Sequence, residues 1–140
     1  MLNADDWCSR RWRVALVAHD AKKNTLAAFV QRYQTQFRNW ELLATASTGE
    51  ALREATGLRL RTVLPAARGG DVQIGAEIAA GEIDALIFLR DPLTAQAHEP
   101  DIATLLRVAD LHNVALATNL ATAECVVRAL SPERVLATRG

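Results

Sequence analysis

The sequence predicts an α/β protein, a single domain with three α/β/α layers around a mostly parallel, five-stranded, Rossmann-like sheet. Its 140 residues match the usual size of one domain, so residues 1–140 are expected to form one unit, with an N-terminal extension (1–12) and a C-terminal tail (131–140). Five short apolar runs alternate with longer stretches of helical period. Repeated βαβ units around a parallel sheet produce this alternation.

The five apolar runs are the predicted strands. Val14–Ala18 and Ala85–Leu89 are apolar throughout, as expected for strands that are buried on both faces of a parallel sheet. Three further runs have the usual strand length and are predicted at Leu42–Thr45, Leu60–Leu64 and Ala115–Thr118.

The stretches between the strands carry apolar residues at the spacing of one helix face. From Leu26 to Phe37 these residues recur at i, i+3, i+4, i+7 and i+11, which predicts a single amphipathic helix. A second helix is predicted to open at Thr48 and Gly49 and to end at Gly57, since glycine commonly ends helices. Three more helices are expected from Asp71 to about Ala80, from Ile102 to Ala109 and from Thr122 to Leu130.

The composition excludes several classes of protein. Sixteen Lys and Arg balance 16 Asp and Glu, so no global field attracts nucleic acid or an anionic membrane. The apolar runs are far shorter than the ~20 residues that span a bilayer. Cys8 and Cys125 lie far apart without a CxxC motif, which argues against a disulfide framework and a structural zinc site. Charged residues occupy the start of the chain, where a secretory signal would be apolar, so we expect a cytoplasmic protein.

Ligands of parallel sheets bind at the carboxyl ends of the strands, where helix N-termini also point. Polar or glycine residues follow all five predicted strands, in order: His19, Asp20 and Lys23; Thr45, Ser47 and Thr48; Gly69, Gly70 and Asp71; Asp91, His98 and Asp101; Thr118, Asn119 and Thr122. The opposite edge, with turns at 81–84 and 112–113, is expected to be ordinary solvated surface. Arg107 and His112 are also expected at the surface.

Each of these polar residues also has a purely structural explanation. Helix capping explains five of them, because their side chains can accept the free N–H groups of a first turn: Asp20, Thr48, Asp71, Asp101 and Thr122. Lys23 is explained as a solvated lysine, although a cation in a first turn opposes the helix dipole. His98, between Ala97 and Glu99, is explained as a surface or turn residue.

Taken together, the residues at this edge favour a phosphate ligand. Threonine and serine hydroxyls, helix N-termini and a lysine suit a phosphate group. Gly69 and Gly70 permit a close approach of the backbone to a ligand, while Asp71 and His98 suit proton transfer beside it. The glycine-rich patterns of dinucleotide sites and P-loops are absent. A small phosphorylated metabolite therefore fits better than a nucleotide.

Five segments resemble the methylglyoxal synthase family in order and spacing: VALVAHDAKK, ATASTG, RGGDVQIGAEIAAGEIDALIF, RDPLTAQAHEPDIATLLR and ALATNLATAE. The resemblance runs from about Arg13 to Leu130. Its most specific pieces are His19-Asp20 with Lys23, Gly69-Gly70-Asp71, and Asp91-Pro92 followed by His98 and Asp101.

The resemblance implies a lyase that converts dihydroxyacetone phosphate to methylglyoxal and inorganic phosphate without metal or organic cofactor, as a homohexamer inhibited by phosphate. By position, Asp71 is the base that removes a C3 proton, and His98 binds the substrate oxygens and moves protons in the enediolate. Asp20, Asp91 and Asp101 orient and tune these groups. The residues implied in substrate or phosphate binding are His19, Lys23, Thr45, Ala46, Ser47, Thr48, Pro65, Ala66, Gly69 and His98.

Some positions depart from the family pattern. The residues Pro65-Ala66-Ala67 stand where the family usually has Ser-Gly-Pro, a loop that supplies a hydroxyl and N–H groups to the phosphate, and proline has neither. Ala46 replaces a common glycine, Ser47 a threonine, and Arg90 what is often an aromatic residue. The loop favours an alternative, a binding or regulatory module that resembles the allosteric domain of carbamoyl phosphate synthetase. The presence of Asp71, His98 and Asp101 favours the enzyme.

Overall fold

The structure, a computed structural model, describes residues 11–131 and contains one five-stranded sheet. The strands pair in the order β3-β2-β1-β4-β5, and every pairing among the described residues is parallel. Their bounds are β1 (Arg13–Ala18), β2 (Glu41–Thr45), β3 (Arg61–Val63), β4 (Ala85–Leu89) and β5 (Ala115–Ala117). The α/β fold with a five-stranded sheet is thereby confirmed.

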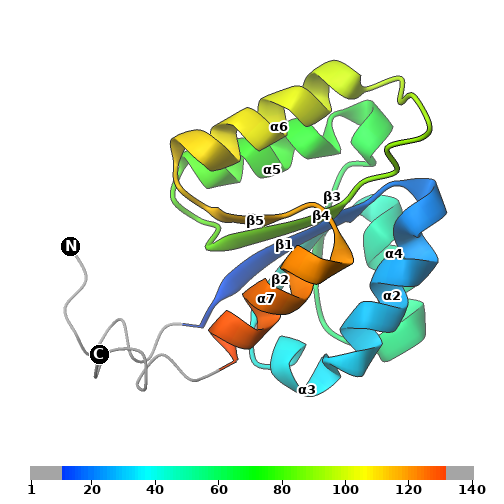
Figure 1. Ribbon diagram of the computed structural model, residues 1–140, viewed down its shortest axis with the longest axis vertical. Coiled ribbons are helices and arrows are strands. Elements are labelled where there is room, and N and C mark those ends of the chain that lie inside the picture. The colour runs from blue at the N-terminus through cyan, green and yellow to red at the C-terminus, as the bar shows by residue number, and fades with distance from the viewer. Residues whose placement is uncertain (1–10, 132–140) are drawn as a thin grey trace.

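Helices cover both faces of the sheet and complete the three layers (Figure 1). One face carries α5 (Gly70–Ala79) and α6 (Glu99–Leu111), which pack against each other. The other face carries α2 (Lys23–Arg32), α4 (Ala46–Thr56) and α7 (Leu120–Leu130), with the short α3 (Gln34–Phe37) following α2.

Two apolar clusters lie on the two faces of the sheet. Leu16 of β1 and Ile87 of β4 belong to the cluster beneath α2, α4 and α7, and both side chains are fully buried. Ala15 and Leu86, their neighbours in the sequence, belong to the cluster beneath α5 and α6. Successive side chains of a strand point to opposite faces, so each central strand contributes to both clusters.

The order of the strands reverses between β1 and β4. The chain runs outward from β1 to β2 and β3, and then returns to pair β4 with the other side of β1. Ligands of such sheets bind at this reversal, outside the carboxyl ends of the strands. His19 follows β1, and its backbone N–H donates to the Leu89 carbonyl at the end of β4 (3.1 Å). The candidate residues after both strands therefore meet at this reversal.

The structure has two helices where the sequence predicts a single one from Leu26 to Phe37, so that prediction is wrong. Tyr33 has φ −105° and ψ 25°, outside the helical region, and divides the segment into α2 and α3. Its hydroxyl donates to Glu124 on α7 (2.8 Å), and its ring packs against Phe29 (centroids 5.1 Å apart). The apolar face continues through the break, because Phe29 and Phe37 are both buried, so periodicity alone does not reveal it.

The strand boundaries and the proposed caps also differ from the prediction. The third strand is shorter than 60–64 and the fifth ends at Ala117 rather than Thr118. The N-caps are Thr45 for α4, Gly69 for α5, His98 for α6 and Asn119 for α7, and Asp20 lies inside a 3-10 turn capped by His19. The capping explanation is therefore wrong for Asp20, Thr48, Asp71, Asp101 and Thr122. Asn119 alone among these caps accepts an N–H with its side chain, from Thr122 (3.0 Å).

The opposite edge of the sheet is only in part the solvated surface that the sequence predicts, because residues 81–82 and 112–113 are exposed whereas residues 83–84 are not. Ile83 is buried, and the Asp84 carboxylate accepts the backbone N–H of Arg13 (2.8 Å). The turn before β4 therefore packs against the start of β1. Arg107 and His112 are exposed, as predicted.

Residues 1–10 and 132–140 lie outside the described residues, and so does Cys8. The proposed extension and tail therefore stay a prediction. Cys125 is a free, exposed thiol. Among residues 11–131 no helix is both long enough and apolar enough to cross a membrane.

Candidate active site

Asp71 is fully buried at the start of α5, although it carries a carboxylate. The chain reaches this position through Gly69, whose φ of 102° suits glycine. At Gly70 a Cβ atom would lie 2.0 Å from the Leu64 carbonyl oxygen and 3.0 Å from Cγ2 of Thr45. The two glycines therefore let the start of α5 press against the ends of β2 and β3, which places Asp71 inside.

The Asp71 carboxylate has no hydrogen-bond partner for either oxygen within residues 11–131. Nε2 of His98 lies 3.7 Å from Oδ2, too far for a hydrogen bond. Burial raises the pKa of Asp71 from 3.8 to about 6, the nearby His98 opposes this shift, and the charge of Asp101 adds to it. A carboxyl group with this pKa is largely ionised at pH 7 and is a stronger base than a solvated aspartate.

His98 comes from the segment that follows β4. It caps α6, and its carbonyl accepts the backbone N–H groups of Asp101 (3.0 Å) and Ile102 (3.1 Å). Its side chain is only 13% exposed, so the explanation as a surface residue is wrong. Nε2 is buried and has no hydrogen-bond partner in the described part of the chain. The imidazole therefore faces Asp71 with a free nitrogen.

His19 is a second buried imidazole, and its tautomer follows from its partner. The backbone N–H of Asp91 donates to Nδ1 (2.8 Å), so the neutral ring carries its proton on Nε2. Burial lowers the pKa of His19, and the charges of His98 and Arg90 lower it further. The ring packs edge to face against Phe88 and His98, with centroids 5.2 and 6.1 Å away. Nε2 has no hydrogen-bond partner among the described residues, which leaves an N–H available to a ligand.

Two threonines connect the ends of β1 and β2. The hydroxyl of Thr45 donates to Oγ1 of Thr48 (3.2 Å), and the same oxygen accepts the backbone N–H of Ala18 (3.4 Å). Both threonines are buried, whereas Ser47 is exposed and Ala46 is half-buried. Thr45 also lies against Gly70, so the two hydrogen-bonded threonines lie next to the start of α5, which carries Asp71.

Three further predicted residues lie near the two imidazoles: Asp20, Lys23 and Asp91. Lys23 begins α2 and forms an ion pair with the exposed Asp20, which lowers the pKa of that carboxyl. Hydrogen bonds from Thr94 and from the N–H of Leu93 lower the pKa of Asp91. Asp91 thus orients His19 with its backbone N–H and not with its carboxylate.

The loop before α5 folds on itself. The Pro65 carbonyl accepts the N–H groups of Arg68 (2.9 Å) and Gly70 (3.0 Å), closing a 3-10 turn over Ala66–Arg68. Arg68 is exposed, and its guanidinium contacts no other described residue through a hydrogen bond or ion pair. The structure therefore brings together Asp71, His98 and His19, and it leaves Arg68 outside that group.

Sequence reasoning missed two residues of this site. Phe88 is one apolar residue in a buried strand, and no signal distinguishes it from its neighbours until its ring is found against His19. In the sequence, Arg90 stands out only as a departure from the family pattern, whereas in the structure its charge lowers the pKa of His19. Within residues 11–131, no group of three or more His, Cys, Asp or Glu side chains could hold a metal ion.

Comparisons with known proteins identify relatives of the chain. A family model described as MGS-like domain matches residues 25–118. The methylglyoxal synthase of Carboxydothermus hydrogenoformans is 56% identical over 119 residues, which cover 85% of this chain and 98% of that protein. The methylglyoxal synthase of Ralstonia nicotianae is 50% identical over 121 residues, which cover 86% of this chain and 90% of that protein.

A solved structure shares both the fold and much of the sequence. The crystal structure of methylglyoxal synthase from Elizabethkingia anophelis NUHP1 matches with a TM-score of 0.80 and 37% identity, covering 87% of this chain and 79% of that one. The family expected from the sequence segments is thereby confirmed. The chain belongs to the methylglyoxal synthase family.

Proposed function

We propose that the chain is a lyase that converts dihydroxyacetone phosphate to methylglyoxal and inorganic phosphate. The observation that carries this proposal is the buried Asp71, whose two oxygens lack partners among the described residues and whose neighbour is the His98 imidazole. Buried polar groups are almost always hydrogen-bonded, and exceptions call for a catalytic or comparable explanation. A general base that removes a proton from carbon needs a carboxylate oxygen that is free to contact the C–H group. This role explains why the Asp71 carboxylate is unpaired among the described residues.

In the first step, Asp71 takes a proton from C3 of the substrate. The C–H electron pair moves into a new carbon–carbon double bond, and the neighbouring carbonyl becomes an enediolate oxygen. The raised pKa of Asp71, about 6, makes its carboxylate a better acceptor than a solvated one while most of it remains ionised at pH 7.

The two imidazoles stabilise the negative charge that develops on the substrate oxygens. His19 presents a neutral Nε2–H, because Nδ1 already accepts the Asp91 N–H. His98 presents its own free Nε2 beside Asp71 and is placed to move protons between the oxygens of the intermediate. Donors fixed before the reaction stabilise the developing charge without reorganisation.

In the second step, the C3 hydroxyl loses its proton and becomes a carbonyl, the C2–C3 double bond moves to C1–C2, and the C1–oxygen bond breaks so that its electron pair leaves with the phosphate. The remaining enol takes up a proton at carbon and becomes methylglyoxal. Lys23, Ser47 and the N–H groups around Gly69 are assigned to the phosphate, with Ala46, Pro65 and Ala66 lining it. Thr45 and Thr48 hold the ends of β1 and β2 in place for this group. Asp20, Asp91 and Asp101 orient Lys23, His19 and His98 respectively.

The test is incubation of the purified chain with dihydroxyacetone phosphate. Methylglyoxal and inorganic phosphate should appear in equal amounts, because each elimination releases one of each. If neither product exceeds the uncatalysed background, the chain is no methylglyoxal synthase and the binding or regulatory module becomes the better description. One observation favours that second candidate: Pro65 offers no N–H to a phosphate.

Three further properties belong to this proposal. The assembly is a homohexamer, inorganic phosphate inhibits the enzyme by occupying the site of the leaving group, and the enzyme works in the cytoplasm. Light scattering at several protein concentrations tests the assembly, because six copies of a 15.3 kDa chain are easily distinguished from two or four.

A further inference from the structure

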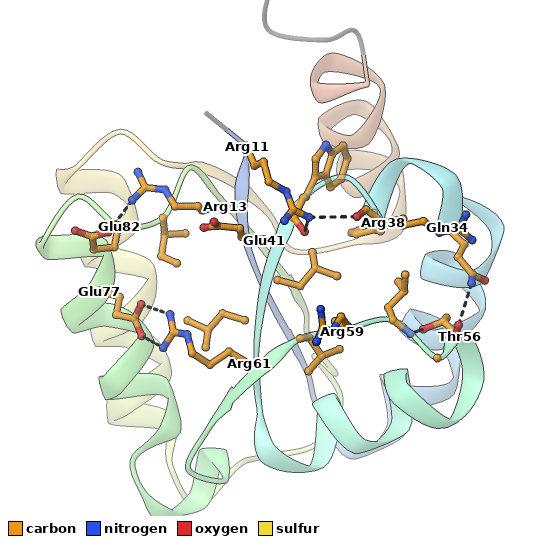
Figure 2. A pocket seen from close by; sticks show the side chains of 18 residues that line it. Arg11, Arg13, Gln34, Arg38, Glu41, Thr56, Arg59, Arg61, Glu77 and Glu82 are labelled. Atoms are coloured by element: carbon orange, nitrogen blue, oxygen red, sulfur yellow. Dashed lines mark hydrogen bonds and ion pairs between the residues drawn. The ribbon is translucent and has the colours of Figure 1, made fainter. Parts of the chain in front are cut away.

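A groove of about 890 Å³ lies at the edge of the sheet opposite the candidate active site (Figure 2). It is formed where the α3–β2 and α4–β3 connections and the turn before β4 meet the starts of β1, β2 and β3. This volume falls in the range of about 300–1,000 Å³ that holds small molecules. We call it the arginine groove because it is lined by Arg11, Arg13, Arg38, Arg59 and Arg61.

Three of these arginines hold the fold together. Arg13 donates to Glu82 (2.7 Å) and Arg61 forms two hydrogen bonds with Glu77 (2.6 and 2.9 Å), as Figure 2 shows. Arg11 donates to the backbone carbonyls of residues 38–40, where α3 has just ended. Cations commonly stabilise the ends of helices in this way.

Arg38 and Arg59 have no such structural explanation. Both are exposed, and neither guanidinium forms a hydrogen bond or ion pair with another residue in the range 11–131. Five arginines face only three glutamates in the groove, although the whole chain has no net charge. The positive charge is therefore concentrated locally, and two fork-shaped donors remain free for an anion.

The floor of the groove is apolar. Trp40, Leu42 and Leu58 line it and are buried, so each shows the groove only a small part of its side chain, and Leu60 is half-buried beside them. A fully inorganic ion would leave this floor in contact with water. A ligand that combines negative groups with a carbon skeleton would cover it and meet the arginines together.

We propose that the arginine groove binds a small organic polyanion, whose phosphate or carboxylate groups contact Arg38 and Arg59. Its carbon skeleton lies on the floor formed by Trp40, Leu42 and Leu58. The groove and the candidate active site lie at opposite ends of the strands, so both sites can be occupied at once. This site does not depend on the proposed lyase activity.

Calorimetric titration tests the proposal with two probes, adenosine diphosphate for phosphate groups and citrate for carboxylates, at low ionic strength because salt screens such contacts. The test variant combines Arg38→Gln with Arg59→Gln. The matched control is Arg107→Gln, which removes an exposed charge outside the groove. We expect at least one probe to bind the double variant tenfold or more weakly than the wild type, since charged hydrogen bonds contribute strongly. The control should bind as the wild type does.

Equal binding of both probes to the double variant and the wild type overturns the proposal, and so does failure of the wild type to bind either probe. Activity toward dihydroxyacetone phosphate is measured in parallel and should be unchanged in the double variant. If the double variant does not fold, Arg38→Lys with Arg59→Lys replaces it. Lysine keeps the charge but loses the planar fork, so a smaller loss of affinity is then expected, and no loss again overturns the proposal.

Discussion

At the scale of single residues, the fully buried Asp71 lowers the stability of the fold. Each unsatisfied buried polar group lowers stability by about 1–3 kcal/mol, and more when it is charged. Neither oxygen of Asp71 is hydrogen-bonded within the described residues, and the neighbouring His98 lies beyond hydrogen-bond distance. Proteins keep such groups where function requires them, at the expense of stability. The same residue should therefore show opposite effects on activity and on stability.

Replacing Asp71 by asparagine should lower kcat by about 10²–10⁴-fold, because the amide keeps the shape but cannot accept the proton. Inhibition by phosphate should stay within a few-fold of the wild type, since the assigned phosphate contacts come from other residues. Steady-state kinetics with dihydroxyacetone phosphate measures both. A variant that retains more than half of the wild-type kcat would remove Asp71 from the mechanism.

The pH dependence of stability should reveal the burial of the same carboxyl. Its pKa is raised in the folded state from 3.8 to about 6, so the folded chain binds the proton more tightly than the unfolded chain does. Stability from this group is full below pH 4 and is lost as the pH rises through 6. Two pKa units correspond to about 3 kcal/mol.

Asp71→Asn has no charge to bury, so its unfolding free energy relative to wild type should rise by up to about 3 kcal/mol between pH 4 and pH 8. Urea titrations at pH 4, 5, 6 and 8, at one protein concentration, provide the comparison. A difference that does not change with pH would mean that the carboxyl is not buried as the structure shows.

At the scale of elements, the order of strands and helices could be predicted from periodicity, but their ends could not. The break lies at Tyr33, whose hydroxyl donates to Glu124, 91 residues away in the sequence, and no local pattern contains that contact. The meeting of His19 with Asp91 could be anticipated, because the ends of parallel strands lie together. The tautomer of His19 could not, because it depends on one hydrogen bond.

The arginine groove could not be predicted from the sequence, because its residues come from turns that are scattered along the chain and form no motif.

The start of α5 should tolerate no side chain at Gly70. A Cβ atom there would lie 2.0 Å from a backbone oxygen, so Gly70→Ala must displace the helix and should destabilise the fold by about 2–3 kcal/mol or more. Gly75→Ala is the matched control in the same helix, because its Cβ would meet only Leu105 at 3.9 Å. Alanine is the better helix former, so this control should gain about 0.5–1 kcal/mol. Urea denaturation of both variants measures the contrast, and equal effects would contradict the close approach at Gly70.

The loop before α5 should bind phosphate more tightly when Pro65 and Ala66 are restored to the family pattern. Pro65→Ser with Ala66→Gly returns a hydroxyl and an N–H, and one hydrogen bond to a charged group contributes about 1.5–3 kcal/mol. The inhibition constant for phosphate should therefore fall by roughly tenfold or more. Arg68→Ala is measured beside it, and should weaken inhibition only if Arg68 reaches the phosphate in solution. No change in the double variant would show that this loop does not contact phosphate here.

At the scale of the whole molecule, β1 and β4 make the two faces of the sheet depend on each other. Leu16 of β1 belongs to the cluster beneath α2, α4 and α7, and Leu86 of β4 belongs to the cluster beneath α5 and α6. All of β4 pairs with β1, from Val14 to Ala18. Loss of packing on one face therefore weakens the strands on which the other face is built, and the described residues should unfold as one cooperative unit.

Leu16→Ala and Leu86→Ala test this dependence, one on each face. Both side chains are fully buried, so each variant should lose about 2–5 kcal/mol of unfolding free energy. Tryptophan fluorescence reports in part on the first face, where Trp40 is buried in the cluster of Leu16, and far-ultraviolet circular dichroism reports on the whole chain. If the faces are coupled, both signals should shift together to lower urea in each variant, at a fixed protein concentration. Separate transitions in Leu86→Ala, with fluorescence unmoved, would mean that the layer of α5 and α6 unfolds independently of the rest.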